Sequence, residues 1–205
     1  MFHLLFGPLL PDSRSGPPAE LAAIAEQVNL LASLLDASGR SPAEASRAVT
    51  QLLRDCIGLR RRLEARVTRA AVHSTDPRLI CEAASELLEV VRLAARLVRC
   101  REWLRLAVSP AEIRELEALG LRSVRLVAGT VKELGRSGGW LGGRAAAQPM
   151  KAEAEELYER GVAAIFAEPL DPLEVLRCKT LYDLLLGVVL GSDRAVKALQ
   201  AASLP

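Results

Sequence analysis

Apolar residues recur every three or four positions along most of this 205-residue chain, with polar residues between them. That spacing places the apolar side chains on one face of an α-helix, whereas a half-buried strand would alternate with a period of two. Six stripes of this kind cover residues 21–35, 49–67, 87–98, 113–134, 150–165 and 178–199. Because no stretch shows a convincing period of two, the pattern predicts an all-α protein.

Capping motifs mark where several of these helices begin. "SPAE" occurs at 41–44 and 109–112, "DPRL" at 76–79 and "DPLE" at 171–174. A serine or aspartate can accept a hydrogen bond from the first helical turn, and proline suits the first helical position. Helices of 25–30 residues would be about 40–45 Å long. Long amphipathic helices joined by short polar turns pack as antiparallel bundles.

The two halves of the chain echo each other. "LEARVTRAAVHSTDP" at 63–77 is similar to "LYERGVAAIFAEPLDP" at 157–172, and each is followed by a helix with an acidic-Leu-Leu centre. We therefore expect one domain over 1–205, built from two related units at about 17–107 and 109–203. The glycine-rich "GRSGGWLGGR" at 135–144 predicts a flexible connector, and Gly161 is expected to let a neighbouring helix approach closely.

The composition indicates the type of core and excludes some classes of partner. Half of the residues are apolar but only 3% are aromatic, which indicates a core of aliphatic side chains. The net charge of +2 gives the whole molecule no strong preference for nucleic acid. The apolar run at 184–191 is far shorter than the roughly 20 residues of a membrane span, so Gly187 and Gly191 are expected to serve helix packing. Four cysteines without a C-x-x-C motif indicate reduced thiols in a cytosolic protein.

The stretch from 152 to 189 carries a family resemblance. Glu153–Tyr158, Asp171–Val175 and Lys179–Leu185 resemble the C-terminal motifs of the PhoU-like family of phosphate-transport regulators. That branch is typically paired with low-affinity phosphate permeases, and the N-terminal half resembles it more weakly. The resemblance implies an all-α fold of six long helices in two antiparallel three-helix bundles. It also implies a cytoplasmic location and no catalytic reaction.

Members of that family can hold multinuclear iron or zinc clusters on acidic helix motifs. Carrying this over gives Glu153, Glu155, Glu156 and Asp183 as candidate metal ligands. For Asp183 the other interpretation is that it tethers and packs the last helix together with Tyr182. Other ligand positions are lost by comparison with the family pattern: after Asp183 they fall near Leu186, Leu190 and Arg194, and in the first half near Ile57 and Gly58.

The other acidic helix of the first half is similarly incomplete. It keeps Glu82, Glu86 and Glu89 but has Leu88 and Arg92 where further acids would stand. Apolar or cationic side chains in a ligand shell remove both ligands and charge compensation. We therefore expect a degenerate site without a cofactor, and the alternative is a reduced site for iron, zinc or another divalent metal.

Arginines form a basic stripe on the helix predicted over 49–67 and just beyond it: Arg54, Arg61, Arg62, Arg66 and Arg69. One interpretation is a patch for an anionic partner. The other is a solvated helix face paired with Glu64, Glu89 and Glu102. No aromatic residues interleave with the arginines, which argues against nucleic-acid binding. His3 and His73 are isolated, so no nucleophile–base pair is predicted.

Three functional hypotheses follow. The first is a non-catalytic cytoplasmic regulator or accessory protein of inorganic phosphate transport, acting through contacts with a transporter or a regulatory protein. The second is a helical protein that binds a metal cluster at a reduced carboxylate site. The third is a structural or dimerising helical adaptor unrelated to phosphate, for which a homo-oligomer is expected. None of the three includes a membrane span or an enzymatic activity.

Overall fold

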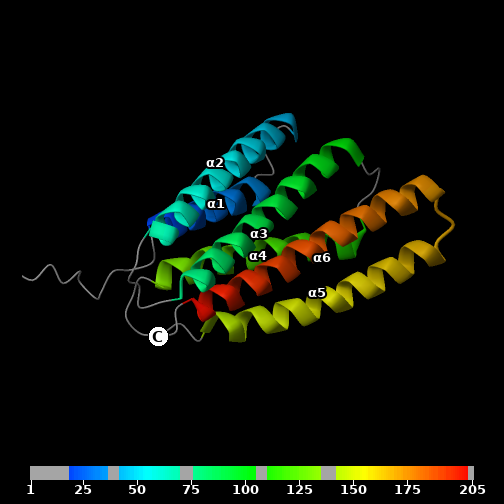
Figure 1. Ribbon diagram of the computed structural model, residues 1–205. Coiled ribbons are helices and arrows are strands. Elements are labelled where there is room, and N and C mark those ends of the chain that lie inside the picture. Colours follow the sequence, from blue (N-terminus) through cyan, green and yellow to red (C-terminus); the bar gives the residue numbers. More distant parts are fainter. Residues whose placement is uncertain (1–18, 37–41, 70–75, 105–109, 135–141, 203–205) are drawn as a thin grey trace, which may run out of the picture.

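The computed structural model describes residues 19–36, 42–69, 76–104, 110–134 and 142–202. Over these ranges the chain forms six α-helices and no strand, and Figure 1 shows them as long rods. The helices are α1 (Ala19–Asp36), α2 (Pro42–Arg69), α3 (Pro77–Leu104), α4 (Ala111–Leu134), α5 (Gly142–Ala167) and α6 (Pro172–Ala201). The all-α prediction is confirmed.

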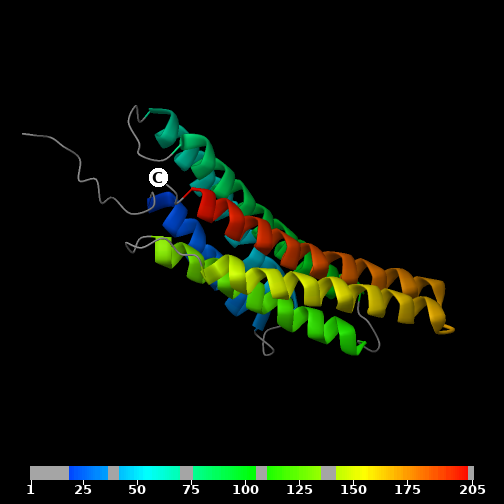
Figure 2. The ribbon, with the colours of Figure 1, turned by 90° about the horizontal axis from the view of Figure 1, so that it is seen from below.

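The helices are arranged as two three-helix bundles. Helices α1, α2 and α3 pack against one another, and α4, α5 and α6 do the same. Each consecutive pair reverses direction, and the two bundles lie side by side with α3 against α6 and α1 against α4 (Figures 1 and 2). This is the architecture that the sequence resemblance implied.

Two of the predicted caps are observed directly. The backbone N–H of Arg78 donates to Asp76 Oδ1 at 2.9 Å, and that of Leu173 donates to Asp171 Oδ1 at 2.7 Å. Each bond satisfies a donor that the first helical turn leaves without an intrahelical partner. Helices α3 and α6 accordingly begin at the prolines that follow these aspartates. Ser41 and Ser109, the other two predicted caps, lie outside the described residues.

The predicted connector at 135–144 is too long by three residues. Helix α5 already begins at Gly142, so Gly142, Gly143 and Arg144 are helical. The run Arg144–Ala147 has high helix propensity, which favours extending the helix backwards through the two glycines. The rest of the connector, including Trp140, lies outside the described residues, as do His3 and His73.

The predicted apolar stripes form the core. Ile24, Leu63, Leu87, Leu116 and Leu199 have no exposed surface or almost none. The larger of two apolar clusters joins α1, α2 and α3 to parts of α4 and α6, and the smaller is built mainly from α4, α5 and α6. The bundles therefore share buried side chains. Among the described residues, no helix combines the length and apolar character needed to cross a bilayer.

Small residues let α3 and α6 approach closely. A Cβ added at Gly191 would lie 3.2 Å from Leu93 Cδ1, and one added at Gly187 would lie 3.5 Å from Leu93 Cδ2. Leu93 thus lies over the two glycines of α6, in the packing role predicted for them.

Gly161 likewise lets α5 and α6 approach closely, and the space for a side chain at this glycine is even smaller. A Cβ at this position would lie 2.5 Å from Cζ of Tyr182, a side chain with no exposed surface. The missing side chain is therefore what allows the tyrosine ring to lie against the α5 backbone. The packing role predicted for Gly161 is confirmed.

We expect Gly161→Ala to lower the free energy of unfolding by about 1–3 kcal/mol, because the added methyl group must displace a buried aromatic ring. This loss would outweigh the gain of about 1 kcal/mol in helix propensity. Gly129→Ala is the matched control, because no atom lies within 4 Å of its added Cβ. It should stabilise the protein by about 0.5–1 kcal/mol. Urea unfolding followed by circular dichroism measures both; equal effects would contradict the close contact.

Candidate functional site

The family-like motifs meet on the hairpin formed by α5 and α6. The hydroxyl of Tyr158 on α5 donates to Asp183 Oδ1 on α6 at 2.8 Å, and the Lys179 ammonium donates to the same oxygen. That ammonium also lies 5.2 Å from the centre of the Tyr158 ring, within the range of a cation–π contact. The hydrogen bonds to Asp183 and Tyr158 raise the pKa of Lys179. Together the three side chains tie the two helices together.

Tyr182 lies buried beside this group. Its ring meets the Tyr158 ring edge-on, with centroids 6.3 Å apart and planes at 90°. Its hydroxyl has no hydrogen-bond partner within the described part of the chain. Burial, followed by the negative charge of Glu112 and by Cys178, raises the pKa of Tyr182 to about 12. The Tyr182 side chain is therefore uncharged at neutral pH and packs in the interior of the hairpin.

The three glutamates predicted as ligands face solvent and lie beside cations. Glu153 contacts Arg122 of α4 at 3.3 Å, Glu155 contacts Lys151 at 3.7 Å, and Glu156 contacts Arg160 at 3.9 Å. Each glutamate side chain keeps about half or more of its surface exposed. They form a solvated helix face with ion pairs, one of which joins α5 to α4.

Cations also stand beside the acids of α3. Arg194 Nε of α6 lies 3.1 Å from Glu86 Oε2, and Arg92 lies 3.5 Å from Glu89. Arg194 and Arg92 occupy positions where the family pattern would place further acids. Two positions expected to supply carboxylate ligands therefore supply guanidinium partners for the acids that remain.

This arrangement does not suit a multinuclear metal cluster. In the ranges that the structure describes, no three histidine, cysteine, aspartate or glutamate side chains gather in a way that could hold an ion. Asp183 is engaged by Tyr158 and Lys179, while Glu153 is engaged by Arg122. The structure thus places the four predicted ligands on one hairpin without joining them into one ligand shell.

The predicted basic stripe lies on α2, at the outer side of the first bundle (Figure 1). The side chains of Arg54, Arg61, Arg62 and Arg66 are exposed. Arg69 is the last residue of α2, and its side chain lies outside what the structure describes. The neighbouring Arg60 lies 2.9 Å from Glu64, as the interpretation of a solvated, ion-paired face expects for that glutamate. An anionic partner for the exposed arginines remains a prediction.

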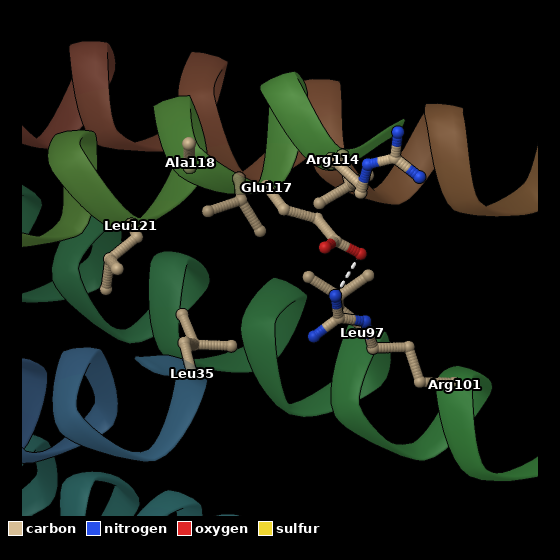
Figure 3. Close-up of a pocket in the computed structure, with 10 residues that line it drawn as sticks. Leu35, Leu97, Arg101, Arg114, Glu117, Ala118 and Leu121 are labelled. Carbon is tan, nitrogen blue, oxygen red and sulfur yellow. Dashed lines mark ion pairs between the residues drawn. The ribbon is translucent and has the colours of Figure 1, made fainter. Parts of the chain in front are cut away.

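A cavity of about 420 Å³ between the bundles was not predicted from the sequence. Its walls are mainly aliphatic, and α3 and α4 contribute charged side chains at the positions shown in Figure 3. The guanidinium of Arg101 and the carboxylate of Glu117 point toward each other and form an ion pair. The lining residues are Leu35, Leu97, Arg101, Arg114, Glu117, Ala118, Gly120, Leu121, Leu185 and Val188. No local motif signals the cavity, because its walls come from four helices distant in sequence.

We compared this chain with known protein families, curated proteins and solved structures. No protein-family model matches the sequence, and a search of curated proteins finds no match. A crystal structure of a PhoU-like protein from Shewanella oneidensis MR-1 matches with a TM-score of 0.70 at 13% sequence identity. The match covers 89% of this chain and 97% of that chain. The chain has a PhoU-like fold. In this PhoU-like fold, the α5–α6 hairpin carries both the acidic helix face and the Tyr158–Asp183 contact.

We expect the purified, tag-free protein to contain well below one equivalent of iron, zinc or other transition metal. A variant with Glu153, Glu155 and Glu156 all replaced by Gln should lose about 1 kcal/mol of stability or less, because exposed ion pairs contribute little. Elemental analysis and thermal unfolding of both proteins test this. Near-stoichiometric metal that disappears in the variant would show that the carboxylate site survives.

Tyr182→Phe should leave stability at pH 7 unchanged or raise it by up to about 1 kcal/mol, because a hydroxyl without a partner is removed from the core. Tyr158→Phe is the control and should lose about 0.5–1.5 kcal/mol, because it removes the bond to Asp183. Urea unfolding measures both variants.

The pH dependence gives a second test of Tyr182. Its pKa is about 12 in the folded protein, against 10 for a tyrosine in water, so only the unfolded chain ionises between these values. Stability should therefore fall as pH rises from 10 to 12, and less so in Tyr182→Phe. Cys56, whose pKa burial raises to about 12, contributes the same slope to both proteins. An unchanged slope in the variant would contradict the burial of Tyr182.

Proposed function

We propose that this chain is a non-catalytic regulator or accessory protein of inorganic phosphate transport in the cytoplasm, acting by contact with a transporter or a regulatory protein. The observation that carries the proposal is the fold likeness to a PhoU-like protein over 89% of the chain. The motifs at Glu153–Tyr158, Asp171–Val175 and Lys179–Leu185 support it, because they resemble the same family in the sequence alone.

The geometry of those motifs favours a scaffold over a reaction centre. Tyr158, Lys179 and Asp183 satisfy one another across α5 and α6, and Tyr182 is buried behind them. Such an arrangement stiffens a hairpin and leaves its outer surface available to another protein. A rigid helical surface suits recognition, since little conformational entropy is lost on binding.

The metal-cluster hypothesis receives less support than the scaffold hypothesis, because Arg122 and Arg194 lie beside acids that a cluster would need. The adaptor hypothesis shares the proposed mode of action but predicts a different phenotype. It expects a stable homo-oligomer and no response to phosphate.

Deletion of the gene should change the rate of inorganic phosphate uptake, and reintroducing the intact gene should restore the original rate. Uptake of radiolabelled phosphate by the deletion strain, the complemented strain and the parent measures this. Uptake of an unrelated anion such as sulfate is the control, because a general membrane defect would alter both. Equal phosphate uptake in all three strains would contradict the proposed function.

A further inference from the structure

Exposed hydrophobic side chains concentrate at one end of the α5–α6 hairpin. Over the described ranges, six large hydrophobic side chains are exposed, and four of them lie between residues 166 and 176. Phe166 is 67% exposed, Leu173 53% and Leu176 62%, with Leu170 at 37%. Single exposed leucines are ordinary on protein surfaces, but a concentration of large apolar groups is typical of an interaction site. We refer to residues 166–176 as the hairpin tip.

The hairpin tip is an ordered structure. The N–H of Glu168 donates to the carbonyl of Ala164 at 3.1 Å, and the N–H of Leu170 donates to the carbonyl of Glu168 at 2.8 Å. Asp171 then caps α6. Both views of the molecule show the tip projecting beyond the ends of α3 and α4 (Figures 1 and 2). Phe166, Leu173 and Leu176 are left exposed there, while Val175 packs against the smaller apolar cluster.

The charges of the hairpin tip are acidic. Glu168, Asp171 and Glu174 lie within it, and it contains no lysine or arginine. Arg177, the first cation after it, is paired with Glu174. The pKa of Cys178, one turn further along α6, is raised first by burial and then by Glu174 and Glu168. This direction agrees with a negative potential at this end of the hairpin.

We propose that the hairpin tip docks onto an apolar protein surface flanked by lysine or arginine. The leucines and Phe166 would supply the buried area, and Glu168 would face the basic rim of the partner. Cytoplasmic ends of membrane-protein helices have this composition, since their loops are enriched in lysine and arginine. The inference rests on the proposed function only in that such a regulator needs a protein partner.

The same charges disfavour the other occupants. A second copy of the tip would bring two sets of acidic side chains together, which is unfavourable for an apolar contact of this size. An anionic lipid surface would repel Glu168 and Asp171 and attract only the apolar side chains. A basic protein surface is the occupant for which both the apolar and the charged groups are complementary.

A labelled amphipathic helical peptide with a leucine face flanked by lysines provides the probe. Fluorescence anisotropy should show saturable binding to the intact protein, and Leu173→Ser together with Leu176→Ser should weaken it at least about tenfold. Leu30→Ser is the matched control, because Leu30 is 49% exposed on α1, away from the tip. Circular dichroism checks that all the variants are folded. No binding, or equal binding by the tip variant, would overturn the proposal.

A charge series tests the basic rim. Glu168→Gln should weaken peptide binding and reduce its dependence on salt, whereas Glu133→Gln on α4 should change neither. The same peptide with glutamates in place of lysines should bind at least about tenfold more weakly. If the acidic peptide binds as well as the basic one, the proposed charge complementarity is wrong.

Two further measurements separate the other occupants. Binding to phosphatidylglycerol vesicles that Leu173→Ser and Leu176→Ser abolish would show that lipid occupies the tip and would overturn the proposal. A dimer in analytical ultracentrifugation that the same two substitutions dissociate would also overturn the proposal, because it would show that a second copy of the chain occupies the tip. We expect neither.

Phosphate uptake distinguishes failure of this inference from failure of the proposed function. A strain carrying only the tip substitutions is compared with the deletion strain and the parent. If deletion changes uptake while the tip strain matches the parent, the docking site is wrong and the function stands. If deletion has no effect but peptide binding still depends on Leu173 and Leu176, the function is wrong and the docking site stands.

Discussion

The close approach of α3 to α6 is the contact on which the rest of the molecule depends. Each three-helix bundle buries only part of its apolar surface by itself, and the remainder is buried where the bundles meet. Leu93 lies over Gly187 and Gly191 of α6, and the space is tightest at Gly191, where an added Cβ would lie 3.2 Å from Leu93 Cδ1. The Arg194–Glu86 ion pair adds a polar contact between the same two helices. A core of aliphatic groups, with few rings to fill gaps, requires helices to be this close.

The acids of the hairpin and of α3 lie beside cations of the same chain. A carboxylate cluster without metal would be destabilised by repulsion between like charges, and a cation beside each acid removes that repulsion. Arg122 and Arg194 have this role for Glu153 and Glu86, and Lys179 has it for Asp183. The Arg122–Glu153 and Arg194–Glu86 pairs also join helices from different parts of the chain. Charge compensation here comes from the protein itself.

The sequence was sufficient to predict the helices and two of their caps, because these depend on spacing and on residues near in the chain. It also predicted the packing role of Gly161, because a glycine inside a helical pattern indicates a close approach, but it did not identify Tyr182 as the neighbour. The family resemblance was sufficient to predict the arrangement of six helices in two bundles. Neither could identify Arg122 as the partner of Glu153 or Arg101 as that of Glu117, since each pair joins two helices whose relative rotation is set by the whole core. The exposure of Phe166 was also missed. Its apolar character alone does not show that it is exposed, whereas the adjacent Ile165 is buried.

The contact between Gly161 and Tyr182 also has a consequence for how this protein can change in evolution. An alanine at 161 destabilises the fold unless the ring at 182 is replaced by a smaller side chain, and an aliphatic side chain in place of the ring at 182 leaves a void unless 161 gains volume. Loss of the ring and gain of a side chain at 161 are therefore each unfavourable when they occur first. Among homologous chains, these two positions on separate helices should therefore vary together, with one bulky and the other minimal in each lineage.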